Sequence, residues 1–99
     1  MASLYIAEFT TLGAPWGNVV QSGQTPPVTE QKLAIGVSSV QSAAFGSKTL
    51  IVRISTDAIC SVAFGDNPTA TSNNARMAAN QTEYFAVVPG QKVAVITNT

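Results

Sequence analysis

Residues 48–65 read KTLIVRISTDAICSVAFG, and this stretch decides the fold class. Its first half, from Lys48 to Ser55, alternates between two faces, one with Leu50, Val52 and Ile54 and the other with Thr49, Ile51, Arg53 and Ser55. An alternation of period two is typical of a strand with one buried face. We place Leu50, Val52 and Ile54 on the core side, because the opposite choice would bury the charge of Arg53. The first half therefore predicts a strand over 48–55.

The second half of the stretch repeats this pattern from Ala58 to Gly65, with Cys60, Val62 and Phe64 on one face. Only Thr56-Asp57 separates the two halves. A connection of two residues is typical of a β-hairpin. We therefore expect a second strand over 58–65 that pairs with the first.

Four further runs have strand periodicity, at residues 3–9, 31–37, 82–88 and 91–97. Between the last two lies Pro89-Gly90, which predicts a type II turn. Proline presets the φ angle of the second turn position, and glycine accepts the positive φ of the third. The pattern predicts an all-β domain, a small sandwich or barrel of about six to seven strands with long polar loops.

Two irregular segments separate these runs. Residues 10–30 contain three glycines and three prolines, which are incompatible with helix and unfavourable in a sheet. Residues 66–81 form a second polar loop, with at most one helical turn near residues 75–79. The 99 residues suit one domain, so we expect a single β domain over 1–99 with an irregular arm at about 10–30.

The charge content excludes several classes of partner. Only 10% of the residues are charged and the formal net charge is zero, which protects a surface poorly against association. The five basic residues are scattered along the chain, whereas nucleic acids and anionic membranes need them clustered. They are Lys32, Lys48, Arg53, Arg76 and Lys92. We expect a subunit of an assembly, with no nucleic-acid or membrane partner.

Catalytic chemistry has little to build on. The chain has no histidine and one cysteine, which removes the usual nucleophile pairs and any zinc site of nitrogen and sulfur ligands. The five carboxylates are better explained as turn or strand residues than as a catalytic pair. The loop with Asp66, Asn67, Asn73 and Asn74 leaves open a weak calcium site completed by backbone carbonyls. We expect no enzyme, no catalytic residue, no cofactor and no resident metal.

A resemblance is carried by residues 49–70, from Thr49-Leu50-Ile51-Val52 through Phe64-Gly65 to Asp66-Asn67-Pro68-Thr69-Ala70, and by residues 83–96, EYFAVVPGQKVAVI. This half of the chain resembles the small β-sandwich virion proteins of tailed bacteriophages, described as capsid decoration, cement or minor head proteins. The resemblance covers roughly residues 45–97 and leaves the arm unmatched. It implies a non-enzymatic subunit that binds the capsid surface of a virion assembled in the host cytoplasm. The implied partners are the major capsid protein or other virion subunits. The chain is also expected to form a homo-oligomer, for example a trimer.

The arm carries the candidate interface, which consists of Pro15, Trp16, Val19 and Val20. A tryptophan between proline and glycine is a frequent interface anchor, since it offers a large apolar area at low entropic cost. We expect the arm to pack on a neighbouring chain. The alternatives are that Trp16 closes one end of its own core, or that the arm folds back over its own sandwich.

A second function remains open, a carbohydrate- or protein-binding β-module of a phage tail or fibre. A sugar site needs exposed aromatic side chains beside polar groups. Trp16, Tyr5 and Tyr84 are the residues that qualify.

Overall fold

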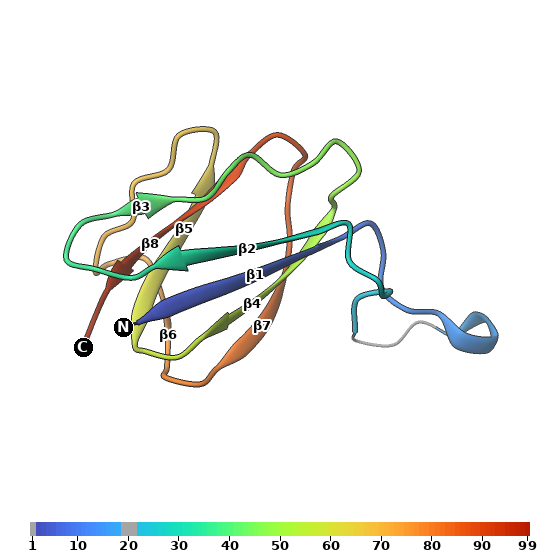
Figure 1. The fold of residues 1–99 in the computed structure, drawn as a ribbon, viewed down its shortest axis with the longest axis horizontal. Helices are drawn as coiled ribbons and strands as arrows, with labels where there is room; N and C mark the ends of the chain where they lie inside the picture. Colours follow the sequence, from blue (N-terminus) through green and yellow to red (C-terminus); the bar gives the residue numbers. More distant parts are fainter. Residues whose placement is uncertain (1, 19–21) are drawn as a thin grey trace.

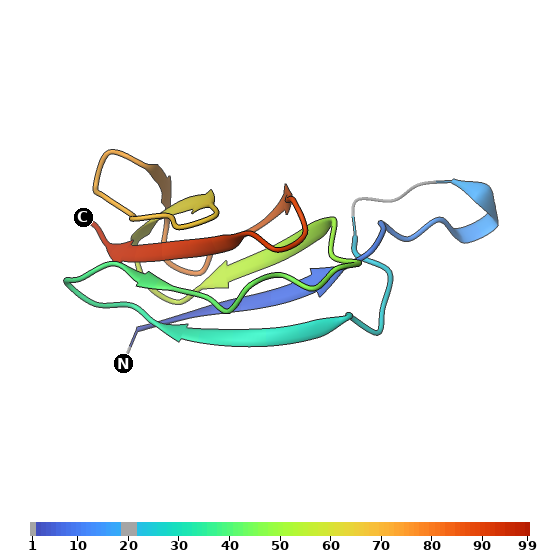
Figure 2. The same ribbon diagram turned by 90° about the horizontal axis from the view of Figure 1, so that it is seen from above.

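The computed structural model describes residues 2–18 and 22–99, which fold into a β-sandwich (Figures 1 and 2). The described residues form two antiparallel sheets of four strands each, and no helix beyond one short 3₁₀ turn. The strands are β1 (Ser3–Phe9), β2 (Thr29–Ala34), β3 (Val40–Gln41), β4 (Ile51–Thr56), β5 (Cys60–Gly65), β6 (Ala75–Met77), β7 (Thr82–Ala86) and β8 (Lys92–Thr97). The all-β class expected from the alternation is confirmed.

The first sheet has the order β2-β1-β4-β7 and the second has the order β3-β8-β5-β6. In the first sheet Ile6 of β1 is opposite Ile54 of β4, and in the second Val62 of β5 is opposite Val95 of β8. Every second side chain of each strand points into the space between the sheets, since successive side chains of a strand point to opposite faces.

A core of apolar side chains fills the space between the sheets. Leu4, Val52, Ile54, Val93 and Val95 are fully buried there, together with Cys60 and Met77 from the second sheet. Cys60 is thus a small core residue, as free cysteines commonly are. Burial raises the pKa of its thiol, against a smaller lowering by the hydrogen bond to Thr56.

The predicted pairing of the two halves of the 48–65 stretch is wrong. β4 pairs with β1 and β7, whereas β5 pairs with β8 and β6. The chain crosses from one sheet to the other at Asp57, whose carboxylate accepts a hydrogen bond from the Ser3 amide at 2.7 Å. A short connection between two alternating strands fits an arch between sheets as well as a hairpin within one.

The predicted core face is correct for Val52 and Ile54 but wrong for Leu50, which is 49% exposed. Thr49 turns inward instead, because its hydroxyl donates to the buried carboxylate of Glu8 at 2.7 Å. The same carboxylate accepts from the Gly46 amide at 3.0 Å and from the Gln31 side chain at 2.7 Å. A cluster of polar groups around the Glu8 carboxylate thus ends the apolar alternation at one end of the core.

Two short strands, β3 and β6, were not expected. The helical turn considered near residues 75–79 is not formed, since Ala75–Met77 pairs with β5. Before β6, the loop after β5 folds over the outer face of the second sheet, where the Ala70 amide donates to the Ser39 hydroxyl at 2.9 Å. Ala94 and Ser61, which point away from the core, are fully buried, and the Asn98 side-chain amide donates both to the Ser61 hydroxyl and to the Ser72 carbonyl of this loop.

The turn expected at Pro89-Gly90 is present. The Gln91 amide donates to the Val88 carbonyl at 3.1 Å, and Gly90 has a φ of 86°. This left-handed angle at the third turn position is the one that a type II turn requires. The turn carries the chain from the first sheet to the second.

Candidate functional site

The connection between β1 and β2 is an arm that projects from one end of the sandwich, away from the start of β1 and the C-terminus (Figures 1 and 2). Its base continues the two strands as a narrow ribbon. Leu12 and Gly23 form an isolated β-bridge, and the Gln24 amide donates to the Thr11 carbonyl at 3.0 Å. Since β2 begins at Thr29, the arm ends slightly earlier than the expected limit of residue 30.

The base of the arm is locked onto the outer face of the first sheet. Gly23 lies against the ring of Phe9, so closely that an added Cβ would come within 2.4 Å of it. The Gly23 amide donates to the Tyr84 hydroxyl at 3.2 Å, and the Phe9 and Tyr84 rings are 6.3 Å apart. The guanidinium of Arg53 lies 5.5 Å from the Phe9 centroid. The alternative that the arm folds back over its own sandwich therefore holds for the base of the arm.

Tyr84 is consequently a structural contact of the arm. Desolvation by burial would raise the pKa of its phenol, but hydrogen bonds with Ser22, Gly23 and Arg53 and the positive charge of Arg53 together lower it. The hydroxyl that a sugar site would have used is engaged by the arm base.

The tip of the arm is a 3₁₀ turn over Pro15–Gly17. Trp16 is 99% exposed there, so the possibility that it closes one end of its own core is excluded. Its φ of 55° places it in the left-handed region, which is strained for a bulky residue. The backbone of Pro15 begins the same turn, and Val19 and Val20 lie outside the described residues.

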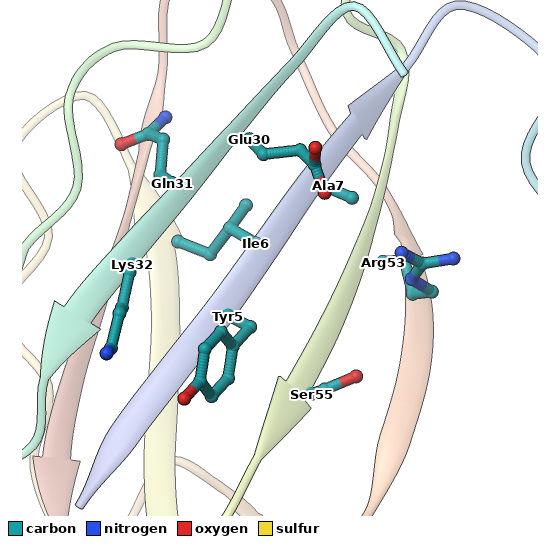
Figure 3. Close-up of a pocket in the computed structure, with 8 residues that line it drawn as sticks. All are labelled: Tyr5, Ile6, Ala7, Glu30, Gln31, Lys32, Arg53 and Ser55. Atoms are coloured by element: carbon teal, nitrogen blue, oxygen red, sulfur yellow. The ribbon is translucent and has the colours of Figure 1, made fainter. Parts of the chain in front are cut away.

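A second candidate site is a shallow hollow on the outer face of the first sheet (Figure 3). The cross-strand register creates it, because the small Ala7 is flanked by Glu30 on β2 and Arg53 on β4. One row further along, Tyr5 lies between Lys32 and Ser55. We call this site the Ala7 hollow and define it by Tyr5, Ala7, Glu30, Lys32, Arg53 and Ser55; it encloses about 340 Å³.

The sequence pattern did not indicate most of the Ala7 hollow. Tyr5 was recognised as an exposed aromatic residue, and it is 46% exposed. Glu30, Lys32 and Arg53 are far apart in the chain, and their meeting depends on which strands pair and in which register. The alternation predicted that Arg53 points outward, but Glu30 fell in the expected arm, and the strand pairing was not predicted.

The part of the chain that the structure describes has no cluster of side chains that could hold a metal ion. Within residues 2–18 and 22–99 no three His, Cys, Asp or Glu side chains come together. In the loop considered for calcium, the amide oxygen of Asn67 accepts from Gln41 and that of Asn74 accepts from Thr71. These two oxygens are held by the protein's own donors.

The described residues also contain no helix with the length and apolar character of a membrane span. Comparison with known protein families, with curated proteins and with solved structures finds no match for the chain.

Proposed function

We propose that the protein is a non-enzymatic structural subunit that docks on a larger assembly through the tip of its arm. The observation that carries the proposal is the position of Trp16, fully exposed at the end of a projecting ribbon whose base is fixed to the sandwich. A large exposed aromatic side chain is costly in water and is a common anchor of interfaces. Because the base is held by Phe9 and Tyr84, the tip is offered to a partner with less ordering cost than a free tail would have.

The assembly proposed is a phage virion, and the partner is the major capsid protein or a neighbouring virion subunit. The support is the resemblance over residues 45–97 and the low content of charged residues, which suits a chain that is permanently covered by neighbours. Genes for a major capsid protein and a portal beside the gene for this chain would support the class of assembly. A gene neighbourhood of metabolic enzymes would contradict it.

The docking role is tested with particles that lack the native subunit. Purified Trp16→Ala protein should fold normally and lose roughly thirtyfold in affinity, the loss of a typical interface anchor of about 2 kcal/mol. The matched control is Tyr5→Ala, which removes an exposed aromatic side chain from the sandwich and should dock like the parent. A tag at the C-terminus lies at the end opposite to the arm (Figure 1) and leaves the tip free. Full occupancy by Trp16→Ala at the parent's concentrations would overturn the arm as docking element.

A further inference from the structure

The Ala7 hollow offers an aromatic surface bordered by hydrogen-bonding groups of both kinds (Figure 3). Tyr5 is 46% exposed, and the ammonium of Lys32 lies 5.4 Å from its ring centroid. The carboxylate of Glu30 extends over Ala7, whose methyl group is too small to fill the space between β2 and β4. The floor of the hollow is therefore small and apolar, and its rim is polar.

The rim combines donors with acceptors. Lys32 only donates, the Glu30 carboxylate only accepts, and the Tyr5 hydroxyl does both. Arg53 is bonded to Tyr84 and the Ser55 hydroxyl to Thr82, so these two residues border the hollow without offering free groups to it. Lys32 and Glu30 stand on adjacent rows of the same face, both on β2, beside Tyr5 and Ala7 of β1. A ligand that lay across the two rows would meet a donor and an acceptor within one short span.

This combination disfavours three other classes of ligand. A phosphate or a carboxylate would be attracted by the two cations but repelled by Glu30, which faces the same space. A metal ion would need several carboxylates, and only one is present in the hollow. A wholly apolar ligand would leave the charged rim without partners.

We propose that the Ala7 hollow binds a neutral saccharide, with one face of a pyranose ring on Tyr5 and its hydroxyls bonded by Glu30 and Lys32. A pyranose has an apolar C–H face and a belt of hydroxyls that both donate and accept, which matches this floor and rim. The volume of about 340 Å³ lies at the lower end of small-molecule sites and suits one or two sugar rings. This binding is separate from the docking of the arm, because the hollow is formed by strands of the first sheet, whereas Trp16 lies at the tip of the arm.

The test is an NMR titration of the ¹⁵N-labelled full-length chain with maltose, lactose and N,N′-diacetylchitobiose in turn. An open site of this size predicts a Kd of the order of 1 mM for the best of the three. The amides of Tyr5, Ala7, Lys32 and Arg53 should shift, while those of the arm and of the second sheet should not. Tyr5→Ala should raise the Kd about tenfold or more, and Tyr5→Phe, which keeps the ring, should change it only a fewfold.

Trp16→Ala is the matched control and should leave the saccharide Kd unchanged. Titrations with sodium phosphate and with calcium chloride under the same conditions should shift none of the four amides. The proposal is overturned if none of the three sugars shifts them up to about 20 mM, if Tyr5→Ala binds like the parent, or if phosphate or calcium binds there instead. Tyr5→Ala should still dock on particles, so failure of the saccharide site and failure of the docking role are told apart.

Discussion

Val52 lies in the middle of β4 and is fully buried between the sheets, whereas Leu50, two residues earlier, is 49% exposed. Val52→Asp should abolish folding, because a buried carboxylate without a partner costs several kcal/mol, a large part of the stability of a small domain. Leu50→Asp is the matched control and should stay within about 0.5 kcal/mol of the parent. Circular dichroism and urea unfolding of the two variants check the contrast. A folded Val52→Asp protein of parental stability would contradict the placement of this strand.

The hydrogen bonds to the Glu8 carboxylate should contribute to the stability of the domain. Thr49→Val keeps the shape of the side chain but removes the hydroxyl that donates to the Glu8 carboxylate. Hydrogen bonds to charged groups contribute about 1.5–3 kcal/mol, so we expect a loss of stability in that range. Thr82→Val removes an exposed hydroxyl that bonds Ser55 and should cost less than about 0.5 kcal/mol. Equal losses of unfolding free energy in the two variants, measured by urea unfolding, would show that the hydrogen bond from Thr49 to Glu8 does not stabilise the domain.

These residues also show what alternation predicts. It identified Val52 and Ile54 as core residues, because they flank Arg53, whose charge would be buried if the strand faced the other way. It failed at Leu50, because the inward position beside it is taken by Thr49, whose partner Glu8 is 41 residues away in the chain. A buried polar contact between distant residues leaves no periodic signal in the sequence.

At the scale of the element, the turn between β7 and β8 depends on one glycine. Gly90→Val would force a β-branched residue to a φ of 86° and should cost about 1 kcal/mol or more. Gly65→Val is the control, since an added Cβ at Gly65 meets no atom within 4 Å and its φ is not positive. Thermal unfolding of both variants measures the difference. A melting temperature of Gly90→Val equal to that of the parent would count against the turn.

The base of the arm depends on another glycine for a different reason. Gly23→Ala would place a methyl group 2.4 Å from the Phe9 ring, so the arm would have to lift from the sheet. We expect a loss of about 1–3 kcal/mol, typical of an overpacked contact, and faster amide exchange at Gly13 and Gln24. Gly36→Ala, where a Cβ meets open space, should change neither quantity. Unchanged exchange in Gly23→Ala would mean that the Gly23–Phe9 contact does not hold the arm.

The strands themselves were predictable, and their pairing was not. Six runs of alternation placed six of the eight strands described, with ends that differ by a few residues. β3 and β6 have two and three residues, too short to show a period. The connection at Asp57 is equally compatible with a hairpin and with a crossing between sheets, so the arrangement of β4 and β5 required the three-dimensional structure.

At the scale of the whole molecule, the two candidate surfaces were predictable to different degrees. The arm is a local feature, because its glycines, prolines and single tryptophan mark it within one segment. The Ala7 hollow is assembled from three strands, and its residues lie between positions 5 and 55. Composition indicated a subunit with few charges, but it gave no sign of where the few charges gather.

The arm can be removed without touching the core between the two sheets. Replacing residues 12–23 by Asn-Gly would close β1 and β2 with a two-residue hairpin between Thr11 and Gln24, which already share a backbone hydrogen bond of 3.0 Å. The variant should fold, because the fully buried core between the sheets contains no residue of the arm. It should lose about 2 kcal/mol, since Phe9 loses its cover by Gly23. It should also fail to dock on particles that lack the native subunit. Circular dichroism tests whether the variant folds, and an unfolded product would show that the fold requires the arm. The binding assay tests docking, and docking at the parent's affinity would show that the arm is not part of the interface.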